Sequence, residues 1–332
     1  MTKSHICLVQ SPLQIINAFE ATSSLSNDQN IHYFIFFQKE TQTNSQMLNT
    51  LKELSVKPHC IVSYNKNALL KVLTWFKIVF ILSRIRDISR FYIGDYMAGQ
   101  LVGIANLYPK ADLFLLDDGT ASYNFVNFRY KNISPQYLKA SKKIPILCFN
   151  PFLPAKITFF SMYNIKLNSP DVLIKNKLSC FSNLITSSDF GPIFFIGCPL
   201  VEVKVISSDI YYEYMTRFFR HYCCQKVIYF PHRREILNQQ KLDFLDSYSV
   251  EIYYQTLPFE IELIKIKTPP SMIISFFSSV FDTLSLIYGK TSDVLVSLRI
   301  STDLIEDTAY KQIANSSYVK YEKSENISIV DL

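Results

Sequence analysis

Strand-like and helix-like segments alternate along the first third of the chain. Short runs rich in β-branched and aromatic residues, typical of strands, occur at 5–10, 32–37, 59–64, 90–95 and 112–118. The segments between them have the composition and periodicity of helices, at 12–21, 43–54, 68–86 and 98–108. Such alternation predicts a parallel sheet with right-handed crossovers, as in a Rossmann-like domain.

The same pattern returns in the second half, and a proline-rich region separates the two halves. Strands are expected at 192–200, 226–230, 250–254, 271–275 and 294–298, and helices at 210–222, 234–247, 258–265 and 279–288. We therefore predict an α/β protein of GT-B type, in which two Rossmann-like domains face each other across a cleft.

The predicted boundaries follow from this pattern and from the length of 332 residues. Residues 1–150 are expected to form an N-terminal Rossmann-like domain, 151–190 a connecting region, and 191–332 a C-terminal Rossmann-like domain. In a GT-B protein the first would be the acceptor side and the last the nucleotide-sugar donor domain. The polar tail, 314–332, is expected to pack loosely.

Composition excludes several classes of protein. Hydrophobic residues make up 48% of the chain and charged residues 19%, which fits a packed globular protein. No Walker or G-x-G-x-x-G pattern occurs, which argues against a P-loop NTPase or a standard dinucleotide fold. The net charge of +6 comes without a polybasic block, so nucleic acid is not an expected partner. Seven cysteines without a C-x-x-C pair indicate thiols in a reducing compartment.

Two segments bear on targeting. The N-terminus has only a short apolar stretch before Ser11 and does not resemble a signal peptide. The apolar segment 68–86 is interrupted by Lys71 and Lys77 and is too short to span a bilayer. A helix with a broad apolar face is expected there, with a membrane-surface helix as the alternative.

The strand expected at 112–118 ends in two aspartates, and a glycine follows them. Asp117, Asp118 and Gly119 fit a turn, because Asp and Gly are common where strands end. They also fit a functional site, because α/β sheets gather such sites at the carboxyl ends of their strands.

Three further short motifs follow strands in the second half. A histidine and two arginines lie in the turn after one strand, and a glutamate begins the helix after another. A serine pair lies where the next helix should start, a position that suits a phosphate. Each group also has a simple structural reading, as a cap, an ion pair with Glu235 or an exposed charge. The candidate residues are His232, Arg233, Glu260, Ser278 and Ser279.

The order of these motifs, with "LVQSPLQIINAFEA" and "FFIGCPLVE", resembles the bacterial lipooligosaccharide sialyltransferases, glycosyltransferase family 52, over most of the chain. The resemblance implies an inverting, metal-independent enzyme that moves sialic acid from CMP-Neu5Ac to a terminal galactose of lipooligosaccharide or a related glycan, with an α-2,3 linkage. It implies that Asp118 is the general base, with Asp117 and Gly119 supporting it.

The resemblance also assigns the donor side. His232 corresponds to a general acid or phosphate stabiliser, although here Pro231 precedes the histidine where many relatives have a proline after it. Glu260 corresponds to the residue that holds the ribose hydroxyls, and Ser278 and Ser279 to the pair that contacts the phosphate. Arg233 adds positive charge, a role the motif does not settle.

The implied partners are a nucleotide-sugar donor, a glycan acceptor of lipooligosaccharide or capsule, and a second copy in a homodimer; no separate cofactor is expected. A cytoplasmic location, peripheral at the inner membrane, is expected. Two alternatives stay open: a glycosyltransferase of the same fold with another donor, such as a glucosyl donor, another nonulosonic acid or a UDP-sugar, and a non-catalytic protein that binds glycans or nucleotides.

Overall fold

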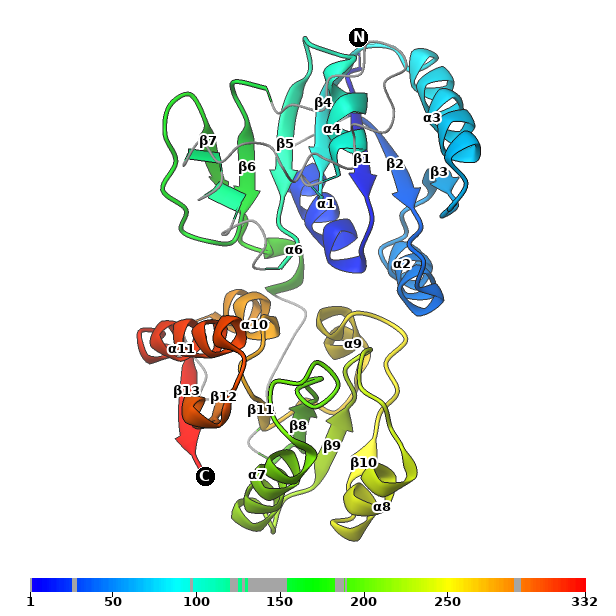
Figure 1. The fold of residues 1–332 in the computed structure, drawn as a ribbon. Helices are drawn as coiled ribbons and strands as arrows, with labels where there is room; N and C mark the ends of the chain where they lie inside the picture. Colours follow the sequence, from blue (N-terminus) through cyan, green and yellow to red (C-terminus); the bar gives the residue numbers. More distant parts are fainter. Residues whose placement is uncertain are drawn as a thin grey trace. The chain divides into compact units, whose positions relative to one another are not determined.

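The computed structural model describes residues 2–25, 29–95, 98–119, 125–126, 129–130, 154–182, 188, 190–289 and 294–332. The chain divides into two compact units, Met1–Leu178 and Ser179–Leu332. Each unit contains one parallel sheet flanked by helices (Figure 1). The prediction of an α/β protein with two Rossmann-like domains is therefore confirmed.

The sheet of unit 1 has seven strands in the order β3-β2-β1-β4-β5-β6-β7, all parallel. The strand order reverses between β1 and β4, and ligands of open α/β sheets bind at the carboxyl ends of strands beside such a switch. The strands are β1 Ser4–Val9, β2 Asn30–Phe36, β3 Pro58–Val62, β4 Ile88–Ile93, β5 Asp112–Leu116, β6 Thr158–Ser161 and β7 Val172–Lys175.

Helices cover both faces of this sheet. Successive residues of a strand point to opposite faces, so Leu8 packs in the core beneath α3 and α4, whereas Cys7 packs in the core beneath α1 and α2. No helix within the described ranges is long and apolar enough to cross a membrane. The helices are α1 Pro12–Leu25, α2 Thr41–Glu53, α3 Ala68–Ser83 and α4 Gly99–Asn106.

The sheet of unit 2 is also parallel, in the order β10-β9-β8-β11-β12-β13, with its switch between β8 and β11. Its strands are β8 Ile193–Ile196, β9 Val227–Phe230, β10 Glu251–Ile252, β11 Met272–Ser275, β12 Leu295–Arg299 and β13 Ile327–Asp331. Its helices are α6 Ser179–Ser182, α7 Ser208–His221, α8 Gln239–Ser247, α9 Phe259–Lys265, α10 Val280–Tyr288, the 3₁₀ turn Thr302–Leu304 and α11 Thr308–Glu322.

The predicted connecting region, 151–190, is not a linker throughout. It contributes β6 and β7 to the sheet of unit 1, and the boundary between the units falls after Leu178. Both strands are four residues long and lie among prolines, so their apolar pattern was too short to recognise.

Two other expectations are corrected. The tail 314–332 does not pack loosely: it contains most of α11 and all of β13, which pairs with β12, and its residues Tyr318 and Tyr321 are buried. The helix expected at 234–247 begins only at Gln239, because the preceding residues form a loop that a buried carboxylate holds in place.

Candidate functional site

The predicted donor-side residues of unit 2 lie at one edge of its sheet. His232 follows β9, Glu260 lies in the first turn of α9 after β10, and Ser278 and Ser279 lie between β11 and α10. Because these strands are parallel, their carboxyl ends share an edge. The sequence therefore predicted the grouping of these residues correctly.

The start of α10 has hydrogen-bond donors that the protein does not use. Ser279 stands at the N-cap position, is exposed, and donates no hydrogen bond to any residue the structure describes. Ser278 accepts a hydrogen bond from the amide of Val280 at 3.4 Å through its hydroxyl, and its carbonyl oxygen accepts one from the Tyr321 hydroxyl at 2.9 Å. A helix N-terminus with a free amide and a free hydroxyl suits a phosphate.

His232 is neutral at neutral pH. Burial, reinforced by the positive charges of Arg233 and Arg234, lowers the pKa of its imidazole to about 4. The Nδ1 atom accepts a hydrogen bond from the backbone amide of Arg234 at 3.1 Å, which leaves the proton on Nε2. A neutral imidazole with an Nε2 proton suits hydrogen bonding to a phosphate oxygen better than it suits general-acid catalysis at pH 7.

The two arginines beside it are exposed, and neither forms an ion pair with a described residue. Arg233 and Arg234 therefore add positive potential near the carboxyl end of β9, where the charge of Glu202 also acts on His232. The charge favours an anionic ligand.

Glu235 fixes the loop that carries His232. Its side chain is fully buried, and Oε2 accepts a hydrogen bond from the His232 amide at 2.6 Å. The Oε1 atom accepts from the Tyr229 hydroxyl at 2.6 Å and from Lys241 Nζ at 2.5 Å. A Cβ atom at Gly197 would lie 1.9 Å from this carboxylate and 2.7 Å from the Tyr229 hydroxyl, so a larger residue there would displace both groups. Glu235 therefore binds the backbone of His232 and not its imidazole, which corrects the expected ion pair.

Glu260 is buried and joins two helices. The Thr283 hydroxyl donates to Glu260 Oε1 at 2.7 Å, so the carboxylate lies within about one turn of the start of α10. Burial raises the pKa of Glu260, while the hydrogen bond from Thr283 opposes that change. Glu262 has a structural role by comparison, because Oε1 accepts hydrogen bonds from the amides of Thr256 and Leu257.

In unit 1, Asp118 lies at the N-terminus of α1. The Ser11 hydroxyl donates to Asp118 Oδ1 at 3.1 Å and accepts from the Gln14 amide at 3.2 Å. Gly119 has a φ of +59°, in the left-handed region that glycine adopts without strain, so the chain turns directly after Asp118. The segment is thus a turn that also presents a carboxylate.

Asp117 is turned into the interior of unit 1. Its carboxylate accepts hydrogen bonds from the Ser161 hydroxyl at 2.8 Å and from the Met162 amide at 2.6 Å. Its carbonyl oxygen accepts from Asn17 Nδ2 at 2.9 Å. Asp117 therefore joins β5 to the end of β6 and to α1, and it supports Asp118 by fixing the backbone.

A cavity of about 170 Å³ in unit 1 was missed by the sequence analysis. It lies at the carboxyl ends of β1, β2 and β3, and Gln10 in its wall directly precedes Ser11. Its polar and aromatic lining has no sequence motif, because the residues come from the segments after β1, β2 and β3 and from the helices α3 and α4. They include Gln10, Gln38, Asn65, Lys71, Trp75 and Gln100.

Metal binding has no candidate cluster in the part of the chain that the structure describes, where no three His, Cys, Asp or Glu side chains come together. Independence from metal stays a prediction.

No protein-family model matches the chain, and no curated protein matches it. Solved structures do match it. UDP-GlcNAc 2-epimerase from Methanocaldococcus jannaschii is 13% identical over 100% of this chain and 89% of that one, with a TM-score of 0.55. The UDP-GlcNAc 2-epimerase from Neisseria meningitidis, bound to UDP-GlcNAc, is 12% identical over 97% of this chain and 93% of that one, with a TM-score of 0.53. TcCGT1 in complex with UDP is 10% identical over 100% of this chain and 86% of that one, with a TM-score of 0.54.

At these identities the likeness shows a shared fold of GT-B type. It also corrects the sequence analysis: the assignment to family 52, and with it the CMP-Neu5Ac-dependent lipooligosaccharide sialyltransferase, is wrong, because the similar structures are of UDP-GlcNAc 2-epimerases. The physical reason is that the motifs behind that assignment lie at strand ends and helix starts. Parallel α/β sheets place polar residues there whatever nucleotide they bind.

Proposed function

We propose that this protein is a glycosyltransferase that uses a UDP-sugar as its donor. The observation that carries the proposal is the set of unused donors at the carboxyl edge of unit 2. These are the start of α10, the Nε2 proton of His232 and the two unpaired arginines. The uridine nucleotide is supported by similar structures that contain UDP or UDP-GlcNAc.

In this proposal the diphosphate binds at the start of α10. The Ser279 amide and the hydroxyls of Ser278 and Ser279 donate to its oxygens, and His232 donates through Nε2. Arg233 neutralises the charge that develops on UDP as the bond to the sugar breaks. Glu260 accepts hydrogen bonds from the ribose hydroxyls, as acidic residues do in other nucleotide-binding α/β domains.

Asp118 is the general base in this proposal. A sugar hydroxyl has a pKa far above neutrality, so its attack requires a carboxylate within hydrogen-bond distance to accept the proton. The cavity beside Gln10 suits a glycan acceptor, because amides bind hydroxyl groups and Trp75 offers an aromatic face. A homodimer and a cytoplasmic location remain part of the proposal.

A second candidate is epimerisation of a UDP-sugar at C2. The similarity to two UDP-GlcNAc 2-epimerases favours it. Epimerisation needs no acceptor, so one assay, run with and without an acceptor, distinguishes the two reactions.

The test follows UDP-GlcNAc, UDP-glucose and UDP-galactose by NMR, with and without oligosaccharide acceptors. If the protein transfers the sugar, UDP is released only when an acceptor is present, and the release is lost in Asp118→Asn. The control Asp112→Asn changes an exposed aspartate at the opposite end of the same strand and should keep full activity. A C2 epimer formed without acceptor would replace transfer with the second candidate. UDP binding without any turnover would contradict both reactions and indicate a protein that only binds the nucleotide.

A further inference from the structure

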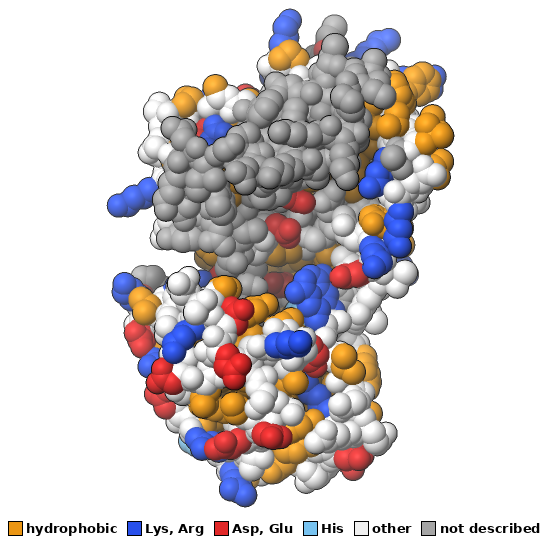
Figure 2. All heavy atoms as spheres, viewed as in Figure 1, with side chains coloured by type: hydrophobic (Ala, Val, Ile, Leu, Met, Phe, Trp, Pro, Cys, Tyr) orange, Lys and Arg blue, Asp and Glu red, His pale blue; other side chains and the backbone are white. Residues whose placement is uncertain are grey.

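The side of α3 that faces solvent is apolar. Leu69, Leu73, Phe76 and Phe80, spaced along one side of the helix, are 68%, 54%, 44% and 56% exposed. We call these four residues the outer stripe. A surface helix ordinarily presents polar side chains outward and buries its apolar side, as α3 also does with Leu82. Figure 2 shows hydrophobic side chains gathered where Figure 1 places α3.

The segment that contains α3 is basic throughout. Residues 54–86 include six lysines and arginines and neither aspartate nor glutamate, and the next acidic residue is Asp87. The formal charge of this segment, +6, equals the net charge of the whole chain. All six cations are exposed. They are Lys57, Lys66, Lys71, Lys77, Arg84 and Arg86.

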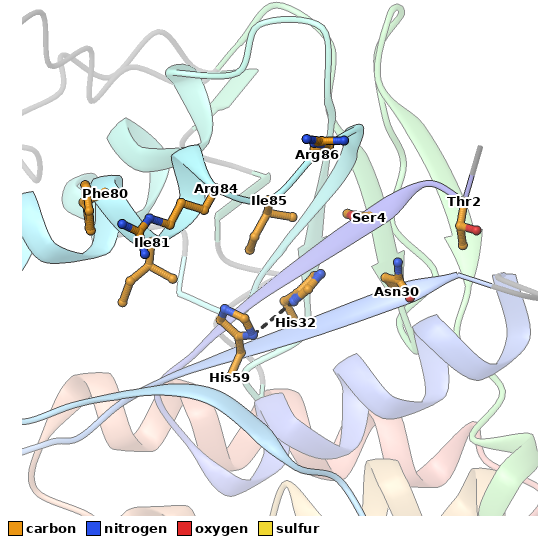
Figure 3. A pocket seen from close by; sticks show the side chains of 10 residues that line it. All are labelled: Thr2, Ser4, Asn30, His32, His59, Phe80, Ile81, Arg84, Ile85 and Arg86. Carbon is orange, nitrogen blue, oxygen red and sulfur yellow. Dashed lines mark hydrogen bonds between the residues drawn. The ribbon is translucent and has the colours of Figure 1, made fainter.

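A pocket of about 500 Å³ lies at the C-terminal end of α3. Figure 3 shows His32 from β2 and His59 from β3 opposite side chains from the end of α3 and the turn after it, namely Phe80, Ile81, Arg84, Ile85 and Arg86. The two histidines share a hydrogen bond between their Nδ1 atoms at 3.2 Å. Ser4 and Asn30, at the starts of β1 and β2, also line the pocket, which places it at the edge of the sheet opposite Asp118.

The arginines at this pocket are not neutralised. Neither Arg84 nor Arg86 forms an ion pair with any residue the structure describes, and the Arg84 guanidinium lies 4.2 Å from the centre of the Phe80 ring. A guanidinium stacked on an aromatic ring keeps its edge free to bind a phosphate. The outer stripe and the phosphate-binding groups are therefore continuous through Phe80 and Arg84.

We propose that the outer stripe and this pocket together form a docking surface for a membrane that contains anionic phospholipid. The stripe enters the boundary between headgroups and acyl chains, the lysines attract the anionic surface, and Arg84 and Arg86 bind a lipid phosphate in the pocket. Charge distinguishes this occupant from a second copy of the chain. Pairing two such surfaces by a twofold axis would bring together two segments of charge +6 each.

The test measures co-sedimentation of the full-length protein with vesicles of phosphatidylcholine alone and of phosphatidylcholine mixed with phosphatidylglycerol. We expect binding to the mixed vesicles that weakens as salt is added. Leu73→Ser/Phe76→Ser/Phe80→Ser should reduce the partition coefficient at least ~10-fold, because the apolar area that enters the interface is lost. Its matched control is Ile313→Ser/Val319→Ser, which changes exposed apolar residues of α11 and should bind as the wild type does.

The pocket is tested by Arg84→Ala/Arg86→Ala, with Arg220→Ala/Lys323→Ala as the charge-matched control. Removal of the two arginines should weaken binding to mixed vesicles ~10-fold or more, and the control should weaken it less. Circular dichroism checks that each variant is folded. Equal vesicle binding by the stripe variant and its control would overturn the proposal. So would binding of inorganic phosphate at Arg84 and Arg86 without vesicle binding, or a stripe-dependent dimer in light scattering without vesicle binding.

Discussion

Asp117 and Asp118 are adjacent in sequence and have different surroundings. Successive side chains at the end of a strand point to opposite sides. The carboxylate of Asp117 is consequently buried against Ser161 and Met162, while that of Asp118 meets the Ser11 hydroxyl at the start of α1. Asp117 stabilises the fold of unit 1 at this edge, whereas the carboxylate of Asp118 is free of that structural role and can accept a proton in the proposed reaction.

This difference predicts unequal effects of the same substitution on stability. Asp117→Asn replaces an acceptor with an amide that donates, so the Ser161 hydroxyl or the Met162 amide loses its partner, and the free energy of unfolding should fall by ~1–3 kcal/mol. Asp118→Asn should change it by less than ~0.5 kcal/mol. Urea denaturation measures both. A larger loss of stability in Asp118→Asn would contradict these roles.

His232 predicts a specific dependence on pH. Its pKa is about 4 in the folded protein, below the value of about 6.5 for an exposed histidine. Between these values the unfolded chain binds more protons, so the stability that His232 contributes falls as the pH drops from 6.5 to 4 and is fully present above 6.5. His232→Asn should remove part of this dependence. The rest includes His5, whose pKa burial also lowers to about 4.

Ligand binding should move this pKa in the other direction. A phosphate beside Nε2 stabilises the charged imidazolium, so UDP should raise the pKa of His232. Titration of the histidine ring signals by NMR, with and without UDP, measures the change. An unchanged His232 signal in a protein that does bind UDP would place the phosphate elsewhere.

The loop between β9 and α8 depends on one buried ion pair. Glu235 and Lys241 are nearly inaccessible, and burial raises the pKa of Glu235 while the Lys241 ammonium opposes that change. Breaking such a pair from one side leaves a buried charge without its counterion. Because Glu235 also holds the His232 amide, the damage should extend to nucleotide binding.

Lys241→Met should accordingly lower the free energy of unfolding by ~3–5 kcal/mol. The double variant Glu235→Gln/Lys241→Met should lose less than the sum of the single variants. Lys226→Met is the control, because its pair with Glu251 is exposed on both sides and contributes less than ~1 kcal/mol. Additive effects of the two buried substitutions would show that the pair is not coupled.

Elements with long periodic patterns were predictable from the sequence, and elements defined by distant contacts were not. The strand β5 and the helix α10 lie within two residues of the ranges expected for them, 112–118 and 279–288. The four-residue strands β6 and β7 lack enough residues to show a pattern. The role of Glu235 depends on Gly197 and Lys241, and no local rule predicts that they meet.

At the scale of the whole molecule, two sheets of similar topology each place candidate residues at their carboxyl edges. This arrangement was predictable, because alternating strands and helices allow few other folds. The donor nucleotide was not, because many enzymes with different substrates share such a fold. The assignment to the sialyltransferases was wrong for this reason: sheets with similar carboxyl edges occur in enzymes that bind different nucleotides.

The most direct test of the central claim is the binding of UDP and CMP to the full-length protein, measured by isothermal titration calorimetry. We expect UDP to bind more tightly than CMP, because CMP has one phosphate where the edge of unit 2 suits two. It also predicts that Ser278→Ala/Ser279→Ala weakens UDP binding ~10-fold or more. Ser285→Ala, which removes a hydroxyl further along α10, should bind as the wild type does. Tighter binding of CMP, or unchanged UDP binding in the double variant, would contradict the account.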